Sequence, residues 1–333
     1  MTNKKLEDFE KREFKHGVVY LGDAHEILPL LGANVAEVCV TSPPYNLNKR
    51  YTESKRLREQ TENEEKDNKS LSNTYSKKFK QWYGDFDEKV ERVKGDMSGY
   101  KNAKEQDYRL DQIEMIAKLL ESCKSSVFYN HKIRMAWHSR TKPINKPPSR
   151  MQHPWDWVRY FHVWCEITWD RRGIGNPVKN RYHSQKEFVY QIERPNKFYQ
   201  MKGEEAYSDI WRISPSKNVG HVCTFPEKLV ENCILPTTDI GDTIIDPYLG
   251  SGTTAIVAVK QGRKFIGIEK NSDYFETACK NIQKTEDERD KMEKEGTFNP
   301  TDLQHVLAAD SVVEFFRKIG EEIKNTEEEN DKS

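Results

Sequence analysis

The sequence contains no long hydrophobic run and no ordered cysteine pattern. No apolar stretch approaches the roughly 18 residues of a membrane-spanning helix, and the opening residues Asn3, Lys4, Lys5 and Glu7 do not begin an apolar leader. The six cysteines are scattered and include no Cys-x-x-Cys pair of the kind found in disulfide frameworks and zinc sites. We therefore expect a soluble, cytoplasmic protein in a reducing compartment, with no membrane partner and no metal.

The chain also has no net charge, because 54 Lys and Arg residues balance 54 Asp and Glu residues. The total charge thus gives no sign of a nucleic-acid partner, but the distribution is uneven. Residues 131–200 hold 14 Lys or Arg against 5 Asp or Glu, and six of the seven tryptophans lie in residues 137–211. Basic side chains interleaved with aromatic ones suit phosphate neutralisation and base stacking. A solvated basic face over a tryptophan-rich core explains this segment equally well.

Residues 243–269 predict a strand, a sharp turn, a helix and a second strand. The first strand is rich in β-branched apolar residues, and Gly250 and Gly252 bracket the turn before an apolar helix. Glycine allows the backbone to approach a ligand closely and to adopt positive φ. The second strand ends at Glu269, roughly 20 residues beyond the turn, the distance at which nucleotide-binding units place a carboxylate for ribose hydroxyls. We therefore expect a ribose-containing ligand at this turn.

Asp246, followed by Pro247, ends the first of these two strands. A carboxylate in this place suits a cationic group on the ligand, whereas a dinucleotide site would put nothing so acidic beside a pyrophosphate. The alternative is a glycine turn that binds no ligand.

A second ligand-facing loop is predicted far upstream. Residues 35–40 form an apolar strand, and Pro43 and Pro44 follow it directly, between Ser42 and Tyr45. Proline has no N–H to donate, so this loop offers carbonyl oxygens and the Ser42 hydroxyl as hydrogen-bond acceptors. Tyr45, just beyond, can stack on a ring. The loop suits a planar substrate that carries an amine; a plain turn or a proline-rich docking motif is the alternative.

These two motifs resemble those of a known family. Thr-Ser-Pro-Pro-Tyr at 41–45, together with Asp-Pro-Tyr-Leu-Gly-Ser-Gly-Thr-Thr at 246–254, resembles the amino-methyltransferases of DNA, which methylate exocyclic amines of cytosine or adenine with S-adenosylmethionine. The catalytic motif precedes the cofactor turn, as in the permuted group often called beta, and the similarity covers residues 18–282. It implies an α/β fold, the Rossmann-like methyltransferase fold, with a mixed, mostly parallel sheet and helices on both faces.

The resemblance also assigns roles to individual residues. The expected catalytic residues are Ser42, Pro43, Pro44 and Tyr45. The expected S-adenosylmethionine-binding residues are Asp23, Thr224, Phe225, Asp246, Pro247, Gly250, Ser251, Gly252, Thr253 and Glu269. Double-stranded DNA is the implied partner, and the basic residues expected to contact it are Arg150, Arg171, Arg172, Lys179 and Arg181.

The implied chemistry is transfer to an amine of a flipped base. Methylation of ring carbon five of cytosine needs a thiolate, and no Pro-Cys dipeptide occurs in the chain. Ser42 is not expected to act as a nucleophile, because no Gly-x-Ser-x-Gly elbow surrounds it. Family members with Ser before Pro-Pro-Tyr act mostly on cytosine, so we expect a site-specific cytosine-N(4) methyltransferase of the restriction-modification or epigenetic type. The alternatives are adenine-N(6) methylation, an RNA or protein methyltransferase, and a non-catalytic DNA-binding relative.

We expect one methyltransferase domain over residues 1–282 and a charged helical tail over residues 283–333. Within the domain, residues 47–95 are polar and predict a mobile insertion, which is either disordered or closes on DNA. Residues 131–211 are interpreted as the DNA-facing region. In a bacterial or archaeal cell, such a cytoplasmic protein would associate with the nucleoid. The sequence leaves open whether the protein forms a homodimer and whether a cognate restriction endonuclease accompanies it.

Overall fold

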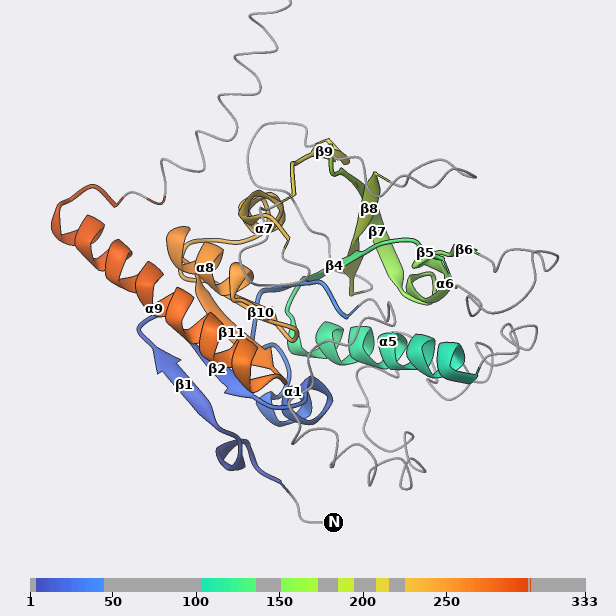
Figure 1. Ribbon diagram of the computed structural model, residues 1–333, viewed down its shortest axis with the longest axis horizontal. Coiled ribbons are helices and arrows are strands. Elements are labelled where there is room, and N and C mark those ends of the chain that lie inside the picture. Colours follow the sequence, from blue (N-terminus) through green and yellow to red (C-terminus); the bar gives the residue numbers. More distant parts are fainter. Residues whose placement is uncertain are drawn as a thin grey trace, which may run out of the picture.

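A computed structural model of the chain describes residues 4–44, 103–135, 151–172, 185–194, 208–215 and 225–298, and residue 300. They form a nine-stranded sheet with helices on both faces (Figure 1). The predicted α/β fold with a mixed, mostly parallel sheet is therefore confirmed.

The strands of the large sheet come from both halves of the chain. They are β1 (Lys11–Phe14), β2 (Gly17–Leu21), β3 (Val38–Thr41), β4 (Ser126–His131), β7 (His162–Asp170), β8 (Lys186–Glu193), β9 (Ile210–Arg212), β10 (Thr243–Asp246) and β11 (Lys264–Glu269). Their order across the sheet is β1-β2-β11-β10-β3-β4-β8-β7-β9. Five strands that are consecutive in this order, namely β2, β11, β10, β3 and β4, run parallel to one another, so their carboxyl ends share one edge. A separate two-stranded sheet joins β5 (Arg134–Met135) to β6 (Met151–Gln152).

Helices cover the two faces of the sheet as two layers (Figure 1). One layer contains α1 (Ala24–Leu31), α5 (Ala103–Ser122) and α6 (Trp155–Val158). The other contains α7 (Glu227–Ile234), α8 (Thr253–Lys260) and α9 (Ser272–Lys294). A short 3₁₀ helix, η1 (Leu6–Asp8), precedes the sheet. Each layer has its own apolar cluster, because the central strands bury side chains on both faces.

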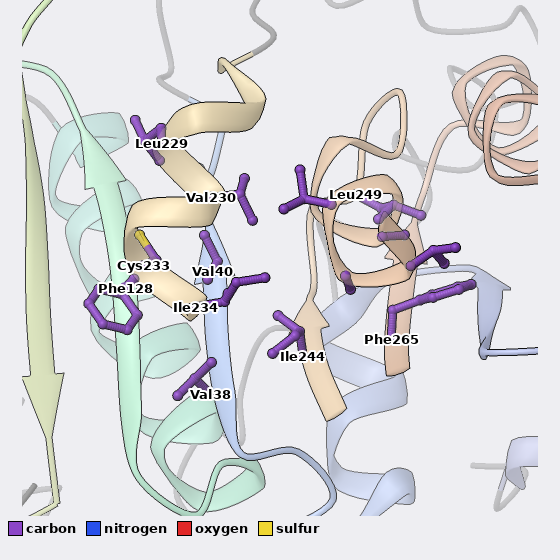
Figure 2. Packing of buried hydrophobic residues seen from close by; sticks show 14 of the residues in the cluster. Val38, Val40, Phe128, Leu229, Val230, Cys233, Ile234, Ile244, Leu249 and Phe265 are labelled. Carbon is purple, nitrogen blue, oxygen red and sulfur yellow. The ribbon is translucent and has the colours of Figure 1, made fainter. Parts of the chain in front are cut away.

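The packing of α7 fixes the position of β3, the strand that leads into the proline loop. Cys233 and Ile234 on α7 face Val38 and Val40 of β3 and Phe128 of β4 (Figure 2). These five residues are at most 3% exposed. Burying a side chain of this size stabilises a fold by about 1.5–3 kcal/mol, so β3 is held firmly between its neighbours and α7.

Two parts of the fold differ from the sequence-based expectation. Strand β1, antiparallel to β2, was not expected, because its exposed edge position leaves it polar. Helix α9 runs without a break across the expected domain boundary at residue 282, and beyond that boundary the buried Glu286 accepts the backbone N–H groups of Lys15 and His16. The start of the expected helical tail is therefore helical up to Lys294 and is bound to the first strands through Glu286, while the domain boundary stays a prediction. The expected insertion at residues 47–95 and the part of the expected tail from residue 301 onward lie outside the described residues.

Candidate active site

Neighbouring strand ends bring the predicted site residues to one edge of the sheet. Asp23 follows β2, Glu269 ends β11, Asp246 ends β10, and Ser42 follows β3. Because β10 lies directly between β11 and β3, the glycine turn and the proline loop are neighbours, although about 200 residues separate them in the sequence. Ligands of open α/β sheets bind at such carboxyl edges.

A buried carboxylate joins the two loops. Asp246 is 1% exposed, and its Oδ1 accepts hydrogen bonds from Thr41 Oγ1 at 2.8 Å and from the Tyr248 backbone N–H at 3.0 Å. Its Oδ2 accepts a hydrogen bond from Thr254 Oγ1 at 2.7 Å. Burial raises the pKa of Asp246 to about 6, although the three donors oppose that rise. Asp246 thus links β3, β10 and α8; its contact with a cationic group of a ligand stays a prediction.

The glycine turn has the backbone conformation that its sequence predicts. Gly250 and Gly252 have φ of 59° and 96°, and Gly252 caps the amino end of α8. A Cβ at Gly252 would lie 3.4 Å from Ala278 of α9. Asn281 of α9 donates a hydrogen bond to the Ser251 carbonyl at 3.0 Å. The expectation of positive φ is confirmed, and α9 supports the turn from behind.

Glu269 lies against this turn. Its Oε2 accepts the Gly250 N–H at 2.8 Å, and its Oε1 accepts the Asn271 N–H at 2.8 Å. Burial raises the pKa of Glu269. The carboxylate is therefore fixed beside the turn, and its contact with a ribose stays a prediction.

Asp23 occupies the next strand end along the edge. It caps α1 by accepting the His25 N–H at 2.8 Å, and it pairs with Lys270 Nζ at 2.8 Å. Burial acts to raise the pKa of Asp23, but the charge and hydrogen bond of Lys270 outweigh it, so the pKa is lowered. A fixed negative charge therefore lies at this end of the site.

The proline loop follows β3 on the other side of the glycine turn. Ser42 is partly exposed, Pro43 is buried and Pro44 is exposed. The hydroxyl of Tyr108 donates a hydrogen bond to the Pro44 carbonyl at 3.0 Å, so α5 also fixes this loop. Tyr45 lies outside the described residues.

A comparison with known families decides the relationship of this chain. A family model described as DNA methylase, of the N6 and N4 type, matches residues 36–280, which include both loops. The chain belongs to this DNA methylase family. The match begins just before β3 and ends within α9.

Individual members of the family match over shorter stretches. The type II methyltransferase M.Cfr9I of Citrobacter freundii is 30% identical over 135 residues, which cover 37% of this chain and 45% of that protein. The DNA adenine methyltransferase YhdJ of Escherichia coli strain K12 is 39% identical over 157 residues, which cover 37% of this chain and 53% of that protein. The chain spans about half the length of the curated relatives it matches.

The fold is similar to that of solved DNA methyltransferases. The PvuII DNA methyltransferase, described as cytosine-N4-specific, superimposes with a TM-score of 0.55 and 16% sequence identity, covering 82% of this chain and 91% of that chain. At this identity the likeness concerns the fold alone.

The remaining predicted cofactor residues are placed as follows. Pro247 and Thr253 are buried on either side of the glycine turn. Phe225 lies just before α7 and packs against the apolar cluster of that face. Thr224 lies outside the described residues. The structure also identifies Thr41, Thr254 and Tyr108, which were not among the expected site residues. Thr41 and Thr254 lie within the two sequence motifs, whereas Tyr108 carries no local signal.

The predicted DNA-contacting residues are only partly described. Arg171 Nη1 lies 2.8 Å from Glu187 Oε1, and its guanidinium lies over the Trp169 ring, 5.4 Å from the centroid. Arg172 has a positive φ of 50° and its backbone N–H bonds to Asp170. The other three, Arg150, Lys179 and Arg181, lie outside the described residues. Contact of these residues with DNA stays a prediction, and the ion pair with Glu187 shows that Arg171 also has a role within the fold.

Two further features concern ligands and membranes. Within the described ranges, no three His, Cys, Asp or Glu side chains gather in a way that could hold a metal ion. The helices in these ranges include none that is long and apolar enough to cross a membrane.

Proposed function

We propose that this protein transfers a methyl group from S-adenosylmethionine to the exocyclic amine of a flipped cytosine in double-stranded DNA, as a cytosine-N(4) methyltransferase of the permuted group. The observation that supports this most is the hydrogen bond between Thr41 and Asp246. This bond and the pairing of β3 with β10 support a site in which a methyl donor at the glycine turn would face an amine at the proline loop.

The residues at the edge fit the cofactor. Gly250 and Gly252 leave the turn without side chains where its backbone would meet the methionine part. Glu269 would accept hydrogen bonds from ribose hydroxyls, and Asp23, at the next strand end, would lie near the adenine. When bound, S-adenosylmethionine supplies an electrophilic methyl group on a sulfonium.

The proline loop would hold the amine. Extruding a base from a duplex costs a few kcal/mol, and stacking on Tyr45 would recover part of this. Ser42 Oγ and the Pro43 carbonyl would accept the two amine hydrogens, which favours a pyramidal nitrogen whose lone pair points out of the ring plane. The lone pair would form the new N–C bond as the bond between the methyl carbon and the sulfonium sulfur breaks, and the nitrogen would give up one proton to solvent. Catalysis here is alignment and electrostatics, without a covalent enzyme intermediate.

Ser42 before Pro-Pro-Tyr favours cytosine as the target, through the family resemblance. Adenine N(6) is the second candidate, and the similarity to YhdJ, described as a DNA adenine methyltransferase, supports it. We further propose that residues 131–211 face the DNA and that the methyltransferase domain extends beyond residue 282, to the end of α9 at Lys294.

Transfer of tritium from labelled S-adenosylmethionine to duplex DNA, RNA and bulk protein tests the proposal. We expect label in duplex DNA and its loss in Ser42→Ala. Label only in RNA or protein would contradict DNA as the substrate. Binding of cofactor and DNA without any transfer would show a non-catalytic relative.

A further inference from the structure

We infer that Tyr108 and His131 form a proton-dependent latch that positions the proline loop, residues 42–44. When His131 carries both ring protons, Tyr108 holds the Pro44 carbonyl; when His131 loses the Nε2 proton, the Tyr108 hydrogen turns to that nitrogen and the carbonyl loses this donor. The catalytic importance of the latch rests on the function proposed above, whereas its chemistry does not.

The latch consists of three short contacts in a row. Tyr108 Oη, on α5, lies 3.0 Å from the Pro44 carbonyl oxygen and 2.8 Å from His131 Nε2. His131 ends β4, which pairs with β3, so the imidazole reaches the same edge of the sheet as the proline loop. On its other side, His131 Nδ1 lies 2.8 Å from the Lys132 carbonyl oxygen.

Counting hydrogens determines which species satisfies all three contacts. A carbonyl oxygen only accepts, so His131 Nδ1 must carry a hydrogen to bond Lys132. In the neutral ring Nε2 is then an acceptor, and the single phenolic hydrogen of Tyr108 can serve Nε2 or the Pro44 carbonyl, but not both. In the imidazolium, Nε2–H donates to Tyr108 Oη and the phenol donates to Pro44. Only the imidazolium form of His131 allows all three of these contacts to be hydrogen bonds at the same time.

The surroundings hold the imidazole in place. His131 is 0% exposed and stacks on Tyr129, with ring centroids 5.9 Å apart and 10° between the planes. The edge of Trp157 meets it at 5.0 Å and 76°. Trp157 Nε1 donates to Tyr129 Oη at 3.1 Å, and Tyr129 Oη donates to Gln112 Oε1 at 2.6 Å. The aromatic neighbours are thus locked, and π-faces tolerate a cation better than aliphatic groups do.

Other titratable groups lie on the elements around the ring. They include Tyr108, Arg109 and Asp111 of α5, Asp156 of α6, Tyr190 of β8, Tyr248 of the glycine turn, and Tyr129 and Lys132 beside His131 itself. Arg109 pairs with Asp156 at 3.1 Å, and Asp111 lies 2.8 Å from His25 Nε2. Both carboxylates have cationic or histidine partners, and the Tyr108 contact links His131 to the proline loop.

The decisive experiment observes the histidine directly, without cofactor or DNA. The full chain labelled with ¹⁵N-histidine is titrated by long-range ¹H–¹⁵N NMR, and His131→Gln assigns the signal. We expect His131 Nε2 to titrate while Nδ1 keeps its proton, and Tyr108→Phe to lower the His131 proton affinity by roughly tenfold, the effect of one lost hydrogen bond to a charged group. Titration of Nδ1 first, or an unchanged pKa of His131 in Tyr108→Phe, would overturn the latch.

The second experiment measures the pH profile of methyl transfer. We expect the wild-type kcat to fall as pH rises through the measured pKa of His131, and Tyr108→Phe to have a kcat roughly tenfold lower without that fall, at unchanged cofactor affinity. Thr277→Val is the control, because its hydroxyl bonds the Asp273 carbonyl within α9, and it should keep the wild-type profile. If kcat falls with rising pH in Tyr108→Phe as it does in the wild type, Tyr108 and His131 do not position the proline loop. If no variant transfers methyl groups but NMR shows the expected titration, the proposed function fails and the latch stands.

Discussion

Thr41 Oγ1 donates a 2.8 Å hydrogen bond to Asp246 Oδ1, joining the residue before Ser42 to the residue that ends β10, ahead of the glycine turn. Both groups are buried, at 0% and 1% exposure. The bond joins the proline loop to the strand that leads into the glycine turn, and in the proposed function these two loops hold the amine and the methyl donor. A misplacement of about 1 Å between reacting groups can cost roughly a hundredfold in rate.

Thr41→Val removes this bond while keeping the shape of the side chain. A buried carboxylate that loses a donor should lower the free energy of unfolding by about 1–3 kcal/mol, and turnover should fall because the loops lose their registration. Urea unfolding and single-turnover kinetics measure the two effects. Thr285→Val is the control: its hydroxyl bonds the Asn281 carbonyl within α9, so it should spare turnover. Equal turnover in both variants would show that the bond does not align the loops.

Asp246 should make stability depend on pH in the acid range. Its pKa is about 6 in the folded protein and about 3.9 when unfolded, so folding favours the protonated form. The resulting stabilisation is complete below about pH 4 and is lost as pH rises past about 6, a change on the order of 2–3 kcal/mol. Asp246→Asn lacks this dependence. Urea unfolding of both proteins should show that the difference between their free energies of unfolding shrinks as pH rises through this range. A difference that does not change with pH would contradict the raised pKa of Asp246.

Gly252→Ala tests whether the turn binds the cofactor. Positive φ makes a side chain cost about 1–2 kcal/mol, and the added Cβ would also lie 3.4 Å from Ala278. Gly241→Ala is the matched control, because Gly241 has φ of 89° in open space before β10, at the opposite edge of the sheet. Both variants should lose similar stability. Calorimetry should show loss of S-adenosylmethionine affinity in Gly252→Ala alone; equal affinities would place the cofactor elsewhere.

Ser42→Ala should separate chemistry from cofactor binding. Loss of one acceptor for the amine should lower turnover at least roughly tenfold, whereas the calorimetric Kd for S-adenosylmethionine should change by less than about twofold. The opposite pattern, with intact turnover and weakened cofactor binding, would exclude Ser42 from the amine site.

The sequence predicted the elements around the two motifs closely. It indicated an apolar helix after Gly252, where α8 lies, and strands that end next to Ser42, Asp246 and Glu269, because these segments are short, apolar and bounded by Pro or Gly. It did not indicate the Thr41–Asp246 bond or the Tyr108–His131 contact. Both join residues from separate elements, and the local pattern of α5 reports only its apolar spacing.

The charge pattern was a weaker guide than the motifs. The sequence predicts that Arg171 contacts DNA, but in the fold its guanidinium lies over the Trp169 ring and pairs with Glu187. Such pairing depends on strand register, which a count of charges does not contain. The end of α9 shows the same limit: the sequence placed a boundary at 282, whereas Glu286 is held by the backbone of Lys15 and His16 at the start of the chain.

The most direct test of the account is to identify the methylated nucleoside. Duplex DNA is incubated with the full chain and S-adenosylmethionine that carries a trideuterated methyl group, digested to nucleosides and analysed by mass spectrometry. The account predicts trideuteromethyl on N4 of deoxycytidine; the label on N6 of deoxyadenosine would correct the base but keep the amine chemistry. A label on carbon five of cytosine, or on no nucleoside at all, would contradict transfer to an amine held between these two loops.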